Sequence, residues 1–126
     1  MDIYPALVAH IAQFAGVDSV FVELPHDFAS KHLPAVQLES AGPARRAPFL
    51  QGLGVDAVGV DVNLYVSPEQ WRAGTSMVVA HKLRAHLYQF RSGRARATEV
   101  SRPEKWPDRN QYTRRIGLTA EILVPA

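Results

Sequence analysis

Histidine is the first residue type to test for chemistry, because imidazole is the commonest acid–base group and metal ligand in proteins. The chain contains five histidines, His10, His26, His32, His81 and His86. His81 and His86 are five residues apart on a predicted helix, so their rings diverge and miss the three-to-four spacing that lets two imidazoles share a metal. His26 and His32 flank Asp27 in a predicted loop without a recognisable site. His10 and His81 are interpreted as polar or half-buried positions, and no metal ligand is predicted.

Other catalytic and cofactor patterns are missing from the sequence. There is no cysteine, which excludes disulfides, thiolate metal sites and a cysteine nucleophile. No serine has the context of a nucleophile elbow, and the glycines at 52–54 precede a predicted strand where a phosphate cradle would precede a helix. Asp61 has no evident carboxylate partner for hydrolysis. We therefore predict no catalytic residue, no cofactor and no enzymatic activity.

Arginine is the most abundant charged residue in the second half of the chain. The series is Arg91, Arg94, Arg96, Arg102, Arg109, Arg114 and Arg115, with Trp106 and Tyr112 nearby. Such a set could bind phosphates and stack a base, but its spacing fits no helix-turn-helix, RNA-recognition or OB signature. The alternative is a solvated charged edge, where arginines discourage unwanted pairing between sheets.

The net charge of +2 conceals an uneven distribution along the chain. Residues 1–81 contain four Lys/Arg and eight Asp/Glu, whereas residues 82–115 contain ten and three. This asymmetry indicates nucleic-acid contact, or complementary patches that meet when copies of the chain associate. A third possibility is that folding interleaves the two signs.

Apolar periodicity predicts the elements of the N-terminal half. A three-to-four spacing predicts a helix over residues 3–15, which Asp2 could cap. Alternation predicts strands at Ser19–Leu24, Ala35–Ser40 and Ala57–Val66, the last of them unusually long. Its core side is expected to carry Val58, Val60, Val62, Leu64 and Val66, and its mostly polar side Ala57, Gly59, Asp61, Asn63 and Tyr65. Residues 41–54, with two prolines and three glycines, are predicted to form a long loop.

A long helix is predicted from Pro68 to about Ser92, with Ser67 and Gln70 forming a capping box and Gly93 ending it. Two apolar stripes run along it. The first consists of Ser76, Val79, Ala80, Leu83, Leu87 and Phe90, and the second of Trp71, Gly74, Val78, His81, Ala85 and Tyr88. One stripe is enough for a helix that is buried on one side. The second is therefore expected to be covered by the N-terminal helix or by a neighbouring subunit.

The C-terminal part is predicted to contain a strand at Ala97–Ser101, a loop over 102–111 and a long final strand. Together these elements predict one α+β domain over residues 1–126. Its sheet is expected to be mainly antiparallel, with about five strands and two helices packed on one face, in the order α-β-β-β-α-β-β. No apolar run approaches the roughly 20 residues that cross a bilayer, and the start of the chain lacks the features of a secretory signal. We therefore expect a soluble, intracellular protein without membrane contact.

With its elements placed, the chain resembles the tail terminator family of long-tailed bacteriophages, whose members cap a finished tail tube and join it to the head. The resemblance lies in the N-terminal helix "YPALVAHIAQF", the segment "HLPAVQLESAG" leading into a long loop, and the strand "GVDVNLYV" passing directly into a helix. The piece "LPAVQL" (Leu33–Leu38), followed by Gly42, is the most suggestive. Other neck and minor tail proteins of this size share the pattern.

The resemblance implies a structural virion protein that forms a ring, commonly a homohexamer. Its expected partners are the tail tube protein and a head–tail connector or stopper protein, with DNA passing through the lumen unbound. It would reside in the tail neck of the virion, and in the host cytoplasm during assembly. Candidate subunit-interface residues are Trp71, Val78, Tyr88, Arg45, Arg46, Arg91, Arg94 and Arg96. Candidate loop residues facing the tube or connector are Phe49, Leu50, Trp106 and Arg109. A small basic nucleic-acid-binding domain is the alternative.

Overall fold

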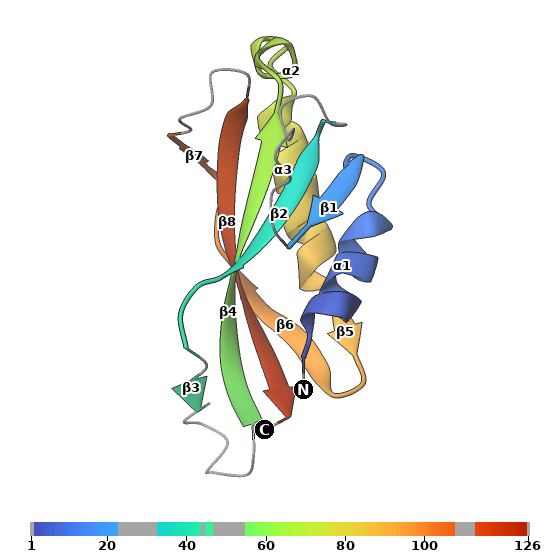
Figure 1. Cartoon of the computed structure of the whole chain (residues 1–126), viewed down its shortest axis with the longest axis vertical. Coiled ribbons are helices and arrows are strands. Elements are labelled where there is room, and N and C mark those ends of the chain that lie inside the picture. The colour runs from blue at the N-terminus through green and yellow to red at the C-terminus, as the bar shows by residue number, and fades with distance from the viewer. Residues whose placement is uncertain (1, 23–32, 44, 47–54, 108–112, 126) are drawn as a thin grey trace.

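Two twelve-residue strands form the centre of the fold, β4 (Val55–Val66) and β8 (Arg114–Pro125). The computed structural model describes residues 2–22, 33–43, 45–46, 55–107 and 113–125. β4 and β8 are antiparallel neighbours in unbroken register from Val55 opposite Pro125 to Val66 opposite Arg114. Both are strongly twisted, and they cross midway in Figure 1. At about 3.3 Å per residue each runs for roughly 40 Å, so the pair sets the length of the molecule.

The remaining strands pair around this central ribbon. The main path of the sheet is β1-β2-β4-β8-β6-β5, while β3 pairs with β4 and β7 pairs with β8. β1 lies parallel to β2 and the other pairs are antiparallel. The bounds are β1 Ser19–Phe21, β2 Ala35–Ser40, β3 Arg45–Arg46, β5 Arg91–Ser92, β6 Ala95–Val100 and β7 Glu104–Trp106. The sheet is therefore mixed but mostly antiparallel.

One face of the sheet carries the hydrophobic core. The predicted core side of β4 is buried from Val60 to Val66, and it continues on β8 through Ile116, Leu118, Ala120, Ile122 and Val124. α1 (Tyr4–Ala12) covers this face with Leu7 and Ile11, and α3 (Ser76–Tyr88) covers it with Leu83 and Leu87. Both helices lie on the same side of the sheet (Figure 1). The fold is therefore an α+β sandwich, in which one layer of helices covers one face of the sheet.

The predicted long helix is in fact two helices. α2 (Pro68–Arg72) begins with the predicted capping box, in which Gln70 N–H donates to Ser67 Oγ at 3.0 Å and Ser67 N–H donates to Gln70 Oε1 at 2.8 Å. Gly74 then adopts a positive φ of 80°, and α3 starts at Ser76. A left-handed residue ends the run of i to i−4 hydrogen bonds. The second predicted stripe assumes one continuous helix. Because the helix is interrupted at Gly74, the spacing from Trp71 to Val78 no longer places these two residues on one helical face.

The prediction of the fold class is confirmed, whereas the predicted number and order of elements are wrong. The described residues form eight strands and three helices. The strands β3, β5 and β7 have only two or three residues, too few to produce an alternating pattern. Two of them lie in segments predicted to be loops, since β3 falls within 41–54 and β7 within 102–111. Gly93 does not end a helix but turns the β5–β6 hairpin with a φ of 60°.

A pair of stacked histidines joins α1 to α3. The rings of His10 and His86 lie 4.0 Å apart at an interplanar angle of 15°. Each Nε2 atom lies 2.6 Å from the backbone carbonyl oxygen of the other histidine, so each donates one hydrogen bond. Burial lowers the pKa of the His10 imidazole, and the neighbouring His86 also lowers it, while the hydrogen bond to the His86 carbonyl opposes the shift. The lowered pKa favours the neutral form of His10 in the folded chain.

The lowered pKa of His10 predicts that the protein is less stable in mild acid. In the unfolded chain His10 has a pKa near 6.5, whereas in the folded chain its pKa is lower. Below about pH 6.5 the unfolded chain therefore binds a proton more readily than the folded chain does. The contribution of neutral His10 to the free energy of unfolding is present above about pH 6.5 and is lost as pH falls through the folded pKa. We expect the melting temperature to decrease between about pH 8 and about pH 5, which lie on either side of the ordinary value. The His10→Gln variant keeps an amide donor without a titrating ring, and its melting temperature should depend less on pH. An equal pH dependence in both proteins would contradict this assignment.

Candidate functional site

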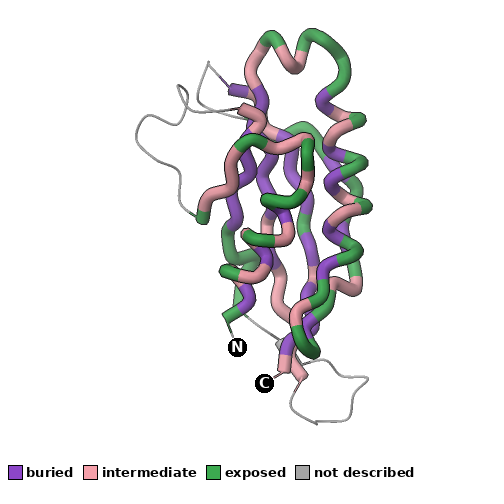
Figure 2. Tube along the Cα trace, turned by 90° about the vertical axis from the view of Figure 1, so that its right-hand side faces the viewer, coloured by how far each residue is buried: buried purple, intermediate pink, exposed green. Residues whose placement is uncertain are grey.

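The two outer faces of the molecule are the candidate functional surfaces, since they differ in charge. The first is the sheet face opposite α1 and α3, called here the open face. Strand register places on it the carboxylates of Glu39, Asp61, Glu99, Glu104 and Glu121, together with the guanidinium groups of Arg96 and Arg115. The second is the outer surface of α3, formed by its exposed residues Val78, His81, Lys82, Ala85 and Tyr88. Figure 2 shows the buried and exposed sides of this helix along its length.

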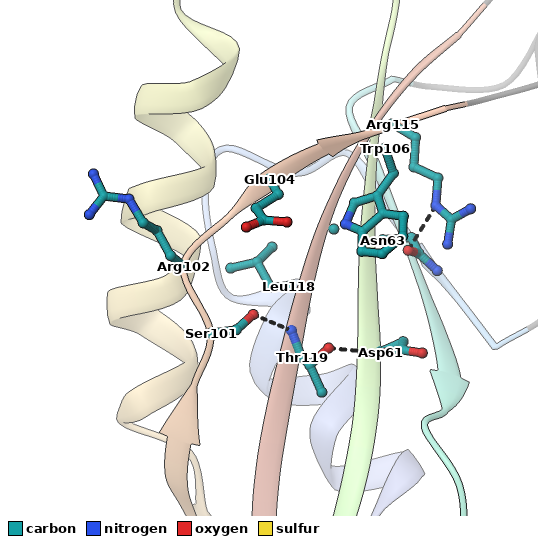
Figure 3. Close-up of a pocket in the computed structure, with 10 residues that line it drawn as sticks. Asp61, Asn63, Ser101, Arg102, Glu104, Trp106, Arg115, Leu118 and Thr119 are labelled. Carbon is teal, nitrogen blue, oxygen red and sulfur yellow. Dashed lines mark hydrogen bonds between the residues drawn. The ribbon is translucent and has the colours of Figure 1, made fainter.

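A first hollow of about 420 Å³ lies on the open face beside β7. Asp61 and Glu104 line it, together with Asn63, Ser101, Arg102, Trp106, Arg115, Gly117, Leu118 and Thr119. Asp61 accepts a hydrogen bond of 2.8 Å from the Thr119 hydroxyl, and Ser101 Oγ accepts one from the Thr119 N–H. In Figure 3 the Arg102 side chain extends away from the other residues, past β6. Its charge is thereby directed out of the hollow.

A polar ladder that crosses three strands begins at Arg115 and Asn63 in the lining of the first hollow. Arg115 Nε donates to Asn63 Oδ1 at 3.0 Å, and Asn63 Nδ2 donates to Gln37 Oε1 at 3.2 Å. The Trp106 indole lies over Gly117, where a methyl group would overlap its ring, and the Arg115 guanidinium lies 6.0 Å from its centre. Trp106 remains 48% exposed. These contacts fix β7 on the open face and present a half-exposed aromatic ring there.

A second hollow of about 590 Å³ adjoins the first, with Ser101 and Thr119 lining both. Its only charged lining residues are Glu99 and Glu121, which face each other directly across β6 and β8. Like charges directly opposite in a sheet are unfavourable. Thr98 donates a hydrogen bond of 2.9 Å to Glu121, but neither carboxylate forms an ion pair with any residue in the described part of the chain. Among the described residues the second hollow is thus an acidic depression without a counter-charge.

The outer surface of α3 has the opposite character. α3 contains Lys82, Arg84 and two histidines and no Asp or Glu. Val78 is 53% exposed and Tyr88 is 41% exposed, so part of the second predicted stripe faces outward. The α1–α3 contact runs through His86, which lies outside the stripe. Within the described residues the N-terminal helix therefore does not cover this surface.

Three of the predicted interface arginines gather at the sheet edge. Arg91, Arg94 and Arg96 line a hollow of about 300 Å³ around the β5–β6 hairpin, and all three are exposed. β5 is the last strand on this side of the sheet. The structure thus brings together an arginine cluster that the sequence presents only as a series.

The other predicted site residues are dispersed. Trp71 is half-buried against the core in α2, with Lys105 Nζ 5.1 Å from its ring centre, and it does not join the outer surface of α3. Arg45 and Arg46 form β3 beside β4. Phe49, Leu50 and Arg109 lie outside the described residues.

Some features of the faces were not anticipated from the sequence. The sequence does not predict the acidic residues of the open face as a group, because they come from five different strands. The order of the strands in the sheet makes them neighbours. Period-two alternation does place Asp61 and Glu121 on the polar sides of their strands. This pattern is the one sequence feature that indicates carboxylates on the open face. His10 and His86 are separated by 76 residues, so no local spacing could pair them.

The geometry of these residues does not assemble a metal site. Among the described residues no group of three or more His, Asp or Glu side chains is arranged to hold a metal ion. The one close histidine pair uses its Nε2 atoms on backbone carbonyls, which withdraws those atoms from ligation. None of the helices in the described ranges is long and apolar enough to span a bilayer.

The contact of Trp106 with Gly117 predicts a specific effect of Gly117→Ala. The added methyl group must displace the indole, and overpacking of this kind costs about 1–3 kcal/mol in free energy of unfolding. Denaturant unfolding of both single variants and the double variant measures the coupling. In a Trp106→Ala background the cost of Gly117→Ala should be smaller by at least about 1 kcal/mol. Equal costs in both backgrounds would show that the ring does not rest on Gly117.

Comparison with known proteins yields no relative from which a role can be taken. No protein-family model matches the sequence, and no curated protein matches it. What the chain does has to follow from its own surfaces: a sheet face with an acidic hollow, and on the other side of the sandwich a helix surface that exposes Lys82.

Proposed function

We propose that the protein is a tail terminator of a long-tailed bacteriophage. In this proposal, copies form a ring, commonly a hexamer, that caps the tail tube, stops its polymerisation and joins tail to head. The proposal is supported by the sequence resemblance and by two surfaces of different chemistry on opposite sides of the fold. Its partners would be the tube protein on one side and a connector or stopper protein on the other, in the neck of the virion. Another neck or minor tail role is the nearest alternative.

The observation that carries the proposal is the presence of an acidic hollow and a cationic helix surface on opposite sides of the molecule. A ring in which copies meet head to tail needs two different, complementary surfaces on each copy. The acidic hollow at Glu99 and Glu121 and the basic outer surface of α3 satisfy that requirement, and they lie on opposite sides of the sandwich.

The mechanism is capping of a polymer. The ring binds the growing end of the tube, blocks addition of the next tube ring and offers its other side to the head. No covalent bond is made or broken. The long β4–β8 ribbon suits this role, because a rigid wall element holds the interfaces of each copy at a fixed angle.

A second candidate function rests on the arginine cluster at the β5–β6 hairpin. Arg91, Arg94 and Arg96 surround one hollow and are exposed, an arrangement that suits phosphate binding. In that case the isolated chain would bind DNA with an affinity that falls steeply as salt is raised.

The proposed function predicts that the protein limits tube length. Tail tube protein from the same virus is polymerised with and without the purified chain, and tube lengths are measured by negative-stain electron microscopy. We expect shorter tubes with increasing amounts of the chain, and a ring of extra density at one end. Unchanged lengths at several-fold excess of the chain over tube ends would contradict the proposal.

The two candidate functions are separated by a DNA-binding assay on the same preparation. A terminator whose lumen only passes DNA should produce no mobility shift of duplex DNA at physiological salt. The Arg94→Glu variant is the matched control, since it alters the cluster without touching the outer surface of α3. A tight shift by the wild-type chain that Arg94→Glu abolishes would favour the nucleic-acid alternative.

A further inference from the structure

We propose that the outer surface of α3 of one copy docks on the second, acidic hollow of the open face of the next copy. This inference rests on the proposed ring and names the surfaces that would close it. The occupant of the hollow is a second copy of this chain, presenting Val78, Lys82 and Ala85.

Charge complementarity is the first argument. Glu99 and Glu121 stand opposite each other on neighbouring strands and form no ion pair with any described residue. Such a pair is stabilised when a cation approaches from outside. Lys82 is exposed on α3, and α3 itself contains no acidic residue that would compete for it. The chain thus carries both the unpaired carboxylates and a cation that can approach them.

Shape is the second argument. The walls and floor of the second hollow include Ala41, Pro43, Ala57 and Gly59, which are small or apolar. Gly59 has no side chain, and an added Cβ would lie 3.1 Å from the Ala41 Cβ. The facing residues of α3 are also small, since Val78 and Ala85 flank Lys82 one turn away on either side. A helix of thirteen residues, about 20 Å long, can approach such a surface closely.

The topology of the fold prevents this contact from forming within one copy. α3 packs its inner side on the core face of the sheet, while the hollow opens on the opposite face. The contact is therefore intermolecular and joins two different surfaces. Contacts of that type repeat around a closed ring, or continue as a filament if the rotation does not close.

Cysteine cross-linking tests the pairing directly, because the natural chain has no cysteine. Val78→Cys places a thiol on the outer surface of α3, and Thr119→Cys places one beside the second hollow. The two single variants are mixed under oxidising conditions at about 1 mM of each, where even a contact with a dissociation constant of about 1 mM is roughly 40% occupied. We expect a disulfide dimer in the mixture and little in either variant alone. Dimers of Val78→Cys with itself, or no dimer in the mixture, would overturn the proposal.

A charge exchange between the two partners adds specificity. Lys82→Glu in the Val78→Cys partner should lower the cross-linking yield about tenfold, as expected for like charges brought face to face. Glu99→Lys in the Thr119→Cys partner should restore it. Arg72→Glu on α2 is the matched control, because it makes the same change in net charge away from the contact. If Arg72→Glu lowers the yield as much as Lys82→Glu does, the proposed contact between Lys82 and Glu99 is wrong.

The same variants distinguish failure of this inference from failure of the proposed function. If tube growth is blocked but the cross-link is absent, the chain is a terminator that associates through other surfaces. If the cross-link forms and tube growth continues, the surfaces are assigned correctly and the association serves another purpose. Circular dichroism of each variant shows whether it has the wild-type fold before either result is interpreted.

Discussion

The pairing of β4 with β8 is the interaction on which the rest of the molecule depends. Its register is unbroken over twelve residues, so every alternate residue of both strands is committed to one side of the sheet. A shift by one residue would exchange the core face for the open face along the whole ribbon. The hydrophobic valines and isoleucines beneath the helices fix the register, and the register in turn fixes where the carboxylates emerge. Core packing therefore determines the placement of the acidic hollow, although Glu99 and Glu121 themselves contribute nothing to the core.

The helical layer is attached to this ribbon by two kinds of contact. Leu83 and Leu87 of α3 and Leu7 and Ile11 of α1 bury apolar surface on the sheet, which is non-directional. The stacked His10 and His86 add a directional contact, since each ring must meet one carbonyl of the other helix. Burial alone would allow α1 to slide along α3. The reciprocal hydrogen bonds favour one axial position and so limit how the outer surface of α3 is presented.

Much of the fold could be predicted from the sequence, and the failures have physical causes. The limits of β2 and the core side of β4 follow from alternation, because those strands are long enough to repeat it. The strands β3, β5 and β7 consist of two or three residues and are held by their neighbours rather than by their own pattern. The apolar spacing places Gly74 in a helical stripe, whereas its positive φ divides the helix. The grouping of carboxylates on the open face could not be predicted from the sequence, since it depends on which strands are neighbours in the sheet.

The β5–β6 hairpin has a consequence for the manner in which copies can add to one another. Sheet edges normally invite uncontrolled growth, since a row of unpaired amides accepts any extended segment. On this side the edge strand has two residues, and exposed arginines surround the hairpin. Lateral fusion of sheets into amyloid-like ribbons is thereby disfavoured there. Such an edge gives the chain a specific protection at high concentration, because fibres that grew from it would deplete the folded protein.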